Sequence, residues 1–232
     1  MQQREKFGEQ QEQVDSMLWD RFVQHHPSAH LLQTSGWGAL KGRFGWRSEI
    51  ITLSSASTSV EAGAQVLYRR VAGLTMAYVP RGPLTDWNDP SLTGALIEAL
   101  IAACRRQGAL FLKVEPELPD TGANRARLAS YGLRPSPQTV QPPSSIVVDL
   151  CGDEDQILQR MKSKWRYNIR LAERRGVTVR CATRGDLSVF NELMHTTGTR
   201  DGFAVHSPGY YMAAFDLLTP DQAAFLLAEY EG

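Results

Sequence analysis

The strongest chemical signal in the sequence is a basic stretch at residues 160–176, RMKSKWRYNIRLAERRG, whose only acid is Glu173. A phosphate backbone is the natural ligand of such a segment, although a solvated helix flank would have the same composition. Its basic residues are Arg160, Lys162, Lys164, Arg166, Arg170, Arg174 and Arg175. Four of these predict a basic stripe on one helix face, because they stand four residues apart: Lys162, Arg166, Arg170 and Arg174. Apolar residues recur every three or four positions and are expected to face the core: Leu158, Met161, Trp165, Ile169 and Ala172.

A second candidate cluster lies at residues 34–46, TSGWGALKGRFGW. Aromatic rings and cations are interleaved there: Trp37, Phe44 and Trp46 surround Lys41 and Arg43. Aromatic rings beside cations suit a ligand that carries both rings and phosphates. The alternative is an amphipathic helix that buries its tryptophan and exposes its lysine.

Two further segments place polar residues where a ligand could bind. In YVPRGP, residues 78–83, a proline-flanked turn would project Arg81 from a strand end, where α/β sheets often bind ligands. The same residues would also make an ordinary turn. In TRDGFAVHSPGYY, residues 199–211, a lone loop histidine is more often structural or solvated than catalytic. The polar and aromatic side chains of that segment are Arg200, Asp201, His206, Tyr210 and Tyr211.

Other catalytic chemistries have no matching motif. The sequence contains no G-x-S-x-G, no H-E-x-x-H, no P-loop and no G-x-G-x-x-G after a strand. No Cys/His set has zinc spacing, and no serine or cysteine sits in a recognisable nucleophile elbow. We therefore expect no metal, no cofactor and no covalent intermediate on the protein.

The composition is that of an ordinary globular protein. The 232 residues are 42% hydrophobic and 22% charged, which is too apolar for a disordered chain. The 25 Lys+Arg balance the 25 Asp+Glu, so a nucleic-acid contact would have to come from a local patch. The N-terminus resembles no signal peptide, and no stretch is long and apolar enough to span a bilayer. Three scattered cysteines, Cys104, Cys151 and Cys181, are expected to be buried thiols, so we expect a cytoplasmic protein.

A linker with four prolines at residues 134–145 divides the chain. Helices and strands alternate on both sides of it, which predicts an α/β or α+β fold. Residues 1–13 form a polar, flexible lead. Before the linker we expect a short helix after Thr34, helices over about 16–25, 90–107 and 123–131, and strands over 48–53, 62–71, 75–79 and 110–114. After it we expect helices over about 153–162, 164–175, 186–197 and 208–218, and strands over 145–150, 177–182 and 223–230.

The second part has a thin predicted sheet for so many amphipathic helices. Its last strand, at 223–230, meets the chain end. We therefore expect this sequence to be a fragment whose second domain is incomplete, and the fragment alone to be inactive.

Five segments in order resemble the Fem-type peptidoglycan-bridge aminoacyltransferases, the FemABX family. QTSGWGALKGRFGW at 33–46 is similar to the family's Q-S/T-x-x-W-x-x-x-K-x-x-x-G-W opening, and YVPRGP at 78–83 to its strand-end signature. LKVEPEL at 112–118 matches the core strand that follows. KSKWRYNIRLAERRGV at 162–177 is similar to K-x-R-x-N-I-R-x-A-x-x-x-G-V, and RDGFAVHSPGYY at 200–211 to R-x-G-F-x-x-R-x-x-x-Y-Y.

The resemblance implies a fold and an activity. The fold is two GNAT-like α/β domains sharing a cleft, here at 14–140 and 145–232, the second incomplete. The activity is transfer of an amino acid from aminoacyl-tRNA to an amine of UDP-MurNAc-pentapeptide or its lipid-linked form. That reaction builds the interpeptide bridge of the cell wall. A lipid-linked acceptor would also bring peripheral contact with the membrane.

The resemblance also implies roles for single residues. Lys41 matches a family lysine that contacts the nucleotide-sugar phosphates, and Tyr210 matches a family tyrosine. His206 stands where the family usually has an arginine, and histidine lacks the bidentate fork, so the phosphate contact moves to Arg200 or is weakened. Together with Trp37 and Arg81, these residues make up the expected acceptor site. The expected tRNA-binding residues are Lys162, Lys164, Arg166, Arg170 and Arg174, although Arg166 and Asn168 are equally suited to a structural role.

Two alternatives stay open at the level of sequence. One is a GNAT-type N-acyltransferase that uses acyl-CoA, although the R/Q-x-x-G-x-G/A pyrophosphate loop that it would need is missing. The other is a non-catalytic Fem-like domain that binds a cell-wall precursor or RNA.

Overall fold

The computed structural model describes residues 15–54 and 59–231. The chain divides into two compact units, residues 1–141 and 142–232, and each is described by itself. The polar lead predicted at residues 1–13 lies outside the described residues.

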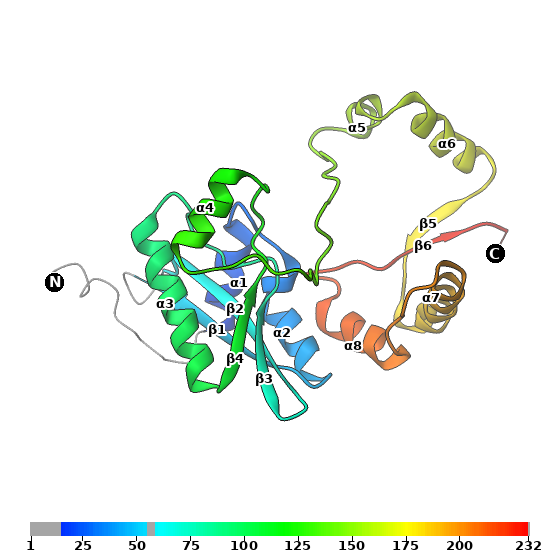
Figure 1. The fold of residues 1–232 in the computed structure, drawn as a ribbon. Coiled ribbons are helices and arrows are strands. Elements are labelled where there is room, and N and C mark those ends of the chain that lie inside the picture. Colours follow the sequence, from blue (N-terminus) through cyan, green and yellow to red (C-terminus); the bar gives the residue numbers. More distant parts are fainter. Residues whose placement is uncertain (1–14, 55–58, 232) are drawn as a thin grey trace. The chain divides into compact units, whose positions relative to one another are not determined.

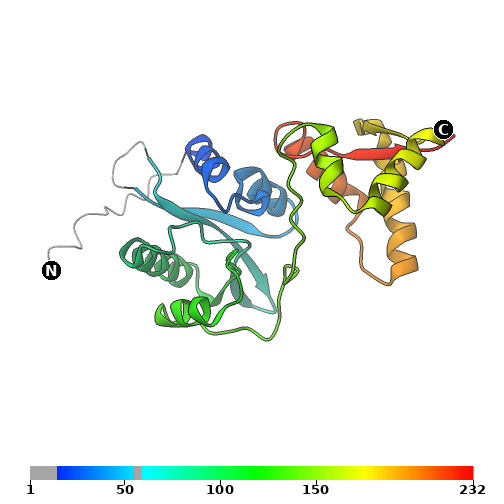
Figure 2. The ribbon, with the colours of Figure 1, turned by 90° about the horizontal axis from the view of Figure 1, so that it is seen from above.

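The first unit is a four-stranded sheet with helices on both faces (Figures 1 and 2). Its strand order is β1-β2-β3-β4, with antiparallel pairing between β1, β2 and β3 and parallel pairing of β3 with β4. Figure 2 shows α1 and α2 on one face and α3 and α4 on the other. The elements are α1 (Ser16–His25), the 3-10 helix η1 (Leu31–Gln33), α2 (Ser35–Gly42), β1 (Arg47–Leu53), β2 (Ala62–Val71), β3 (Leu74–Val79), α3 (Pro90–Arg106), β4 (Ala109–Val114) and α4 (Gly122–Ser130).

The predicted long helix is confirmed as α3, and its ends follow from local chemistry. The carboxylate of Asp89 accepts hydrogen bonds from the N–H groups of Ser91 and Leu92, and Pro90 occupies the first turn. Gly108 follows the last turn with φ +63°, a conformation that glycine adopts without strain.

The alternation of side chains along β2 divides the two faces of the sheet. Even-numbered residues from Ala62 to Tyr68 join the buried core with α3, which also contains Leu96, Leu100 and Cys104. Odd-numbered residues therefore point toward the opposite face, where α1 and α2 lie. Gly63 is one of them, and a Cβ there would lie 2.7 Å from the ring of the fully buried Trp19. The absent side chain lets the indole of Trp19 lie against the strand.

The second unit contains helices and a two-stranded antiparallel sheet of β5 and β6 (Figure 1). Pairing runs from Thr178 opposite Glu229 to Cys181 opposite Leu226. The predicted helix at 208–218 is confirmed as α8, and the helix predicted to end near residue 197 continues to Asp201. The elements are α5 (Glu154–Arg160), α6 (Ser163–Arg174), β5 (Thr178–Cys181), the 3-10 helix η2 (Arg184–Asp186), α7 (Leu187–Asp201), α8 (Pro208–Leu218) and β6 (Leu226–Glu229).

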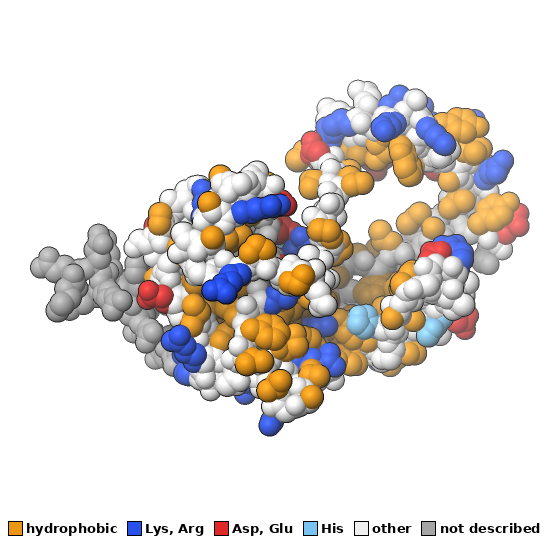
Figure 3. Space-filling view, in the orientation of Figure 1, with side chains coloured by type: hydrophobic (Ala, Val, Ile, Leu, Met, Phe, Trp, Pro, Cys, Tyr) orange, Lys and Arg blue, Asp and Glu red, His pale blue; other side chains and the backbone are white. Residues whose placement is uncertain are grey.

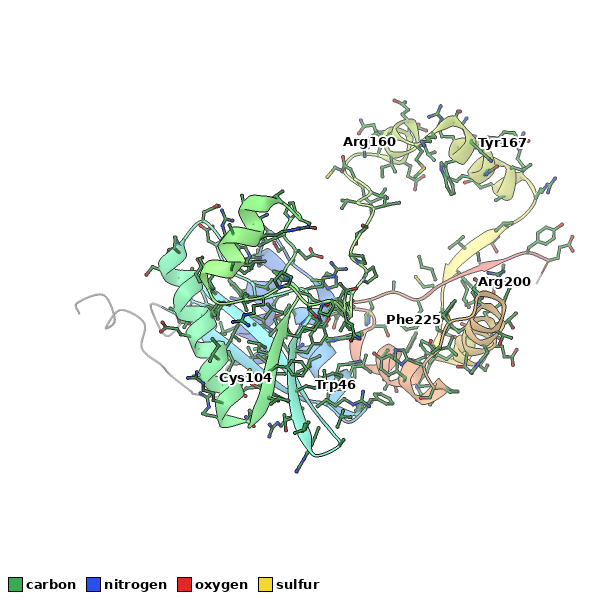
Figure 4. All side chains as sticks on the ribbon, viewed as in Figure 1. Trp46, Cys104, Arg160, Tyr167, Arg200 and Phe225 are labelled. Atoms are coloured by element: carbon green, nitrogen blue, oxygen red, sulfur yellow. The ribbon has the colours of Figure 1, made fainter. Side chains whose placement is uncertain are left out.

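Aromatic rings and one arginine connect the elements of this unit. Phe190 of α7 packs edge-on against Tyr211 and against Phe225, which precedes β6, with ring centroids 5.1 and 5.3 Å apart (Figure 4). The guanidinium of Arg180 on β5 lies 2.7 Å from Glu229 of β6 and 2.8 Å from Asp186 of η2. Arg180 therefore fastens the strand pair to the start of α7.

Three predictions about the second unit are wrong. Residues 145–150 form no strand, because none of the residues that the structure describes pairs with them, and Ile146 is 94% exposed. The apolar face predicted for residues 158–172 is not buried: α5 and α6 contain no buried residue, and Trp165 is 63% exposed. Of the three cysteines only Cys104 is buried, where burial, followed by the neighbouring charge of Glu49, raises the pKa of its thiol to about 11.

Candidate functional site

The helix that carries Trp37 and Lys41 is fixed at its N-terminus by two side chains. Thr34 caps α2 through its hydroxyl, which accepts from the N–H of Trp37 at 3.3 Å. The carboxylate of Asp20 on α1 accepts from the N–H of Ser35 at 2.7 Å and also from the Ser35 hydroxyl. A carboxylate at this end also suits the helix dipole. The position of α2 therefore depends on α1.

The buried side chain of Gln33 connects this helix to the sheet. Its Nε2 donates to the carbonyl of Pro80 at 2.6 Å, and its Oε1 accepts from the N–H of Gln65 on β2 at 2.8 Å. The carbonyl of Gln33 accepts from the indole of Trp19 at 2.6 Å. Gly82 allows the hydrogen bond between Gln33 and Pro80, because a Cβ at position 82 would lie 2.9 Å from Nε2 of Gln33. The glutamine of the first motif and the turn of the second motif therefore form one structure.

A cleft of about 300 Å³ opens on the α2 face of the sheet. Strand alternation brings Leu67, Arg69 and Val71 of β2 and Met76 and Tyr78 of β3 to this one face. Figure 3 shows apolar and basic side chains together over β3 and the end of α2. The lining residues are Trp37, Lys41, Trp46, Leu67, Arg69, Val71, Met76, Tyr78, Pro80, Val140 and Gln141.

Two cations and two indole rings meet in this cleft. Lys41 Nζ lies 5.2 Å from the ring centroid of Trp37 and 5.8 Å from that of Trp46. The guanidinium of Arg69 lies 5.4 Å from the centroid of Trp46. Burial and then the charge of Arg69 lower the pKa of Lys41. The lining contains no carboxylate, so its charged groups favour an anionic ligand.

One wall of the cleft is a piece of the proline-rich segment. The carboxylate of Glu115, just after β4, accepts from the N–H groups of Val140 at 2.7 Å and Gln141 at 3.1 Å. The hydroxyl of Tyr78 donates to Glu115 at 2.6 Å and accepts from the Gln141 amide at 3.1 Å. Burial by itself would raise the pKa of Glu115, but these hydrogen bonds and Lys113 lower it overall. Glu115 therefore holds residues 140–141 in place.

The structure brings some predicted residues of the first unit together and leaves others apart. Trp37, Lys41 and Trp46 share the cleft, whereas Arg43 and Phe44 are not among its lining residues. Arg81 follows β3 as predicted, with φ +50°, and its guanidinium lies 3.4 Å from Glu117. It is not among the lining residues either.

The residues predicted in the 199–211 segment belong to the second unit. The ring of His206 stacks on the ring of the buried Tyr210 with centroids 3.8 Å apart, and the backbone N–H of His206 donates to the Tyr211 hydroxyl. Arg200 lies at the end of α7 and pairs with Asp201 at 2.8 Å (Figure 4). His206 and Tyr210 thus form one aromatic stack, whereas Arg200 forms an ion pair with the adjacent Asp201.

The predicted basic stripe lies on α6, with Lys162 at its N-cap position and Arg174 in its last turn. Arg166 donates to the carbonyls of Gln159 and Met161, so it closes the end of α5. Of the two roles predicted for Arg166, tRNA binding and a structural role, these hydrogen bonds favour the structural one. Figure 3 shows basic side chains over α5 and α6, and Figure 4 shows the exposed Tyr167 on α6.

Sequence reasoning missed Arg69, Tyr78, Gln33 and Glu115. A detectable signal existed for Arg69, because strict alternation along 62–71 places residues 67, 69 and 71 on one face. The roles of Gln33 and Glu115 depend on partners 47 and 26 positions away in sequence, which no local pattern shows.

The fold and the cleft define an α/β protein whose first unit has a cationic, aromatic cleft. Residues 15–126 and 132–231 match the model of the FemAB family. The chain belongs to this family, so the resemblance drawn from five motifs is confirmed.

Similar proteins agree with this assignment. The lipid II:glycine glycyltransferase of Staphylococcus saprophyticus is 31% identical over 224 residues, covering 92% of this chain and 54% of the relative. The protein of the same name from Staphylococcus aureus is 29% identical over 218 residues, covering 89% and 52%. The crystal structure of FemX superposes with a TM-score of 0.84 at 26% identity, covering 94% and 57%. The α/β class is thereby confirmed, and the chain spans about half the length of the curated relatives it matches. None of the helices in the described residues has the length and apolar character of a membrane span.

Proposed function

We propose that this chain serves in the transfer of an amino acid from aminoacyl-tRNA to the amine of a peptidoglycan precursor peptide. The observation that carries the proposal is Lys41, whose Nζ lies 5.2 Å from the ring centroid of Trp37 and 5.8 Å from that of Trp46, in an anion-favouring cleft of a FemAB-family chain. The product would start or extend an interpeptide bridge of the cell wall.

The cleft would bind the acceptor. UDP-MurNAc-pentapeptide and its lipid-linked form both carry a diphosphate, which suits Lys41, and the nucleotide form adds a ring for the tryptophans. The two staphylococcal relatives are named for lipid II, which favours a lipid-linked acceptor. That acceptor would bring the protein to the membrane surface.

The reaction asks little covalent chemistry of the protein. The acceptor amine attacks the carbonyl carbon of the aminoacyl ester and forms a tetrahedral intermediate. The bond to the ribose oxygen of the tRNA then breaks, an amide remains, and the amine proton passes to the departing ribose oxygen or to solvent. Because the ester is already activated, the protein has to position the two substrates and stabilise developing charge.

The donor would use the basic stripe of α6. Lys162, Lys164 and Arg170 are exposed, and exposed cations can follow the phosphate backbone of an acceptor stem. Arg174 extends the stripe by one turn, and Arg166 contributes its charge while closing α5. An aminoacyl-tRNA donor would place the reaction in the cytoplasm.

The acceptor half is tested by calorimetric titration of the chain with UDP-MurNAc-pentapeptide. Lys41→Gln should weaken binding at least tenfold, because one charge-assisted hydrogen bond contributes about 1.5–3 kcal/mol. Arg43→Gln removes an exposed charge from the same segment outside the cleft and should bind like the wild type. Equal affinities of the two variants would refute the proposed acceptor site, and so would a wild type that binds neither UDP-MurNAc-pentapeptide nor its lipid-linked form.

The donor half is tested by the salt dependence of aminoacyl-tRNA binding. Changing Lys162, Lys164 and Arg170 together to glutamine should weaken binding and flatten its dependence on salt, because each lost phosphate contact releases one counterion fewer. The matched control changes the exposed residues Arg43, Arg105 and Arg134 to glutamine. If both triple variants bind with the same salt slope, the stripe has no specific part in tRNA binding.

A further inference from the structure

We propose that Arg69 is a second phosphate-binding residue of the acceptor site and that it shares one diphosphate with Lys41. This inference rests on the proposed function and extends it, because neither the motifs nor the family resemblance pointed to this position. The ligand class is a diphosphate ester or pyrophosphate, as distinct from a singly substituted phosphate.

The position of Arg69 is set by the register of the sheet. Arg69 stands opposite Met76 on β3, and Leu67 stands opposite Tyr78, so all four side chains line the same face. Arg70, the next residue, points away from that face and donates to the carbonyl of Gly73 at 3.3 Å. Both arginines are exposed, but the alternation along β2 puts Arg69 on the face that carries the cleft and Arg70 on the opposite face.

The charges around Arg69 favour an anion. Residues 15–54 and 59–231 contain no ion pair between Arg69 and a carboxylate, and the cleft lining contains no acid. Lys41 and Arg69 are close enough that the charge of Arg69 lowers the pKa of Lys41. Two like charges sharing a partly apolar cleft repel each other, and a ligand with two phosphates would relieve that repulsion.

The geometry keeps the two cations on one ring. Both cations lie near Trp46, with Lys41 Nζ at 5.8 Å and the Arg69 guanidinium at 5.4 Å from its ring centroid. A guanidinium presents paired N–H donors that match two phosphate oxygens, whereas an ammonium acts as a point charge. Arg69 therefore adds a bidentate fork to a cleft in which Lys41 supplies a point charge.

The experiment compares inorganic pyrophosphate with orthophosphate as ligands of the full chain by calorimetry. The wild type should prefer pyrophosphate by about tenfold or more, since two phosphates engage two cations. Arg69→Gln should lower pyrophosphate affinity about tenfold and remove most of that preference, and Arg69→Lys should restore part of it. Arg70→Gln, a matched loss of charge on the same strand, should leave both affinities unchanged.

The outcomes separate this inference from the proposed function. If Arg69→Gln and Arg70→Gln bind pyrophosphate equally well while Lys41→Gln weakens the binding of UDP-MurNAc-pentapeptide, Arg69 only packs on Trp46. The proposed acceptor site then stands. A wild type that shows no preference for pyrophosphate overturns the inference outright. If the wild type prefers pyrophosphate through Arg69 but binds neither UDP-MurNAc-pentapeptide nor its lipid-linked form, the diphosphate site stands and the proposed function fails.

Discussion

Replacing Gln33 by leucine tests whether the buried amide network positions the cleft. Leucine is close to glutamine in volume but cannot donate to Pro80 or accept from Gln65. Two buried polar groups would lose their partners, at about 1–3 kcal/mol each. The more apolar leucine would offset about 1–2 kcal/mol of that loss. The midpoints of these ranges, about 4 and about 1.5 kcal/mol, leave an expected net decrease of about 2.5 kcal/mol in the free energy of unfolding. That is a large share of the total of about 5–15 kcal/mol for a typical protein.

The assay is urea unfolding followed by tryptophan fluorescence. Four of the five tryptophans lie in residues 1–141, and Trp19 donates directly to the Gln33 carbonyl, so the signal reports on the first unit. Gln24→Leu is the matched control, because Gln24 is exposed on α1. If the free energies of unfolding of the two variants agree within about 0.5 kcal/mol, the hydrogen bonds of Gln33 make no measurable contribution to stability.

Three further predictions concern the same region. The hydrogen bonds that lower the pKa of Glu115 contribute fully to stability above the ordinary glutamate pKa of about 4.3. This contribution should disappear as pH falls through the lower folded-state pKa. Urea unfolding between pH 3 and 6 measures the loss, and Glu115→Gln should make the free energy of unfolding depend less on pH in this range. Burial lowers the pKa of Lys41, so diphosphate affinity should fall with rising pH sooner than an ordinary lysine pKa of about 10.4 would predict; calorimetry from pH 7 to 11 measures this, and Lys41→Gln should remove the dependence. Gly82→Ala should lower the free energy of unfolding, measured by urea unfolding, by about 1–3 kcal/mol, because its Cβ would clash with Gln33. Gly42→Ala should leave the free energy of unfolding unchanged, because a Cβ there meets nothing within 4 Å.

The part of the site that lies on one helix could be predicted from sequence. Trp37 and Lys41 are four residues apart, so helical geometry alone brings them together. Arg69 and Tyr78 come from two strands, and their shared face depends on pairing that a local pattern does not specify. Alternation along β2 predicts that Arg69 and Arg70 lie on opposite faces of the sheet. It does not predict which face carries the cleft, because that depends on where Gln33 and α2 pack against the sheet.

The errors in the second unit have a common physical origin. Residues 145–150 have the apolar character of a strand, but a strand needs a partner for its backbone groups, and Ile146 and Val147 are more than 90% exposed. On α6 the periodicity correctly predicted a helix with an apolar face around Trp165. Periodicity shows that such a face exists and does not show what covers it.

The hydrogen bonds of Glu115 have a consequence for the chain that leaves the first unit. Val140 and Gln141 are wall residues of the cleft and also the last residues before the second unit begins. Their backbone N–H groups donate to one carboxylate, so the order of these two residues and the shape of the cleft are thermodynamically linked. A ligand that binds more tightly when residues 140–141 are held by Glu115 would stabilise these two hydrogen bonds, and by linkage the hydrogen bonds would raise the affinity for that ligand by the same factor.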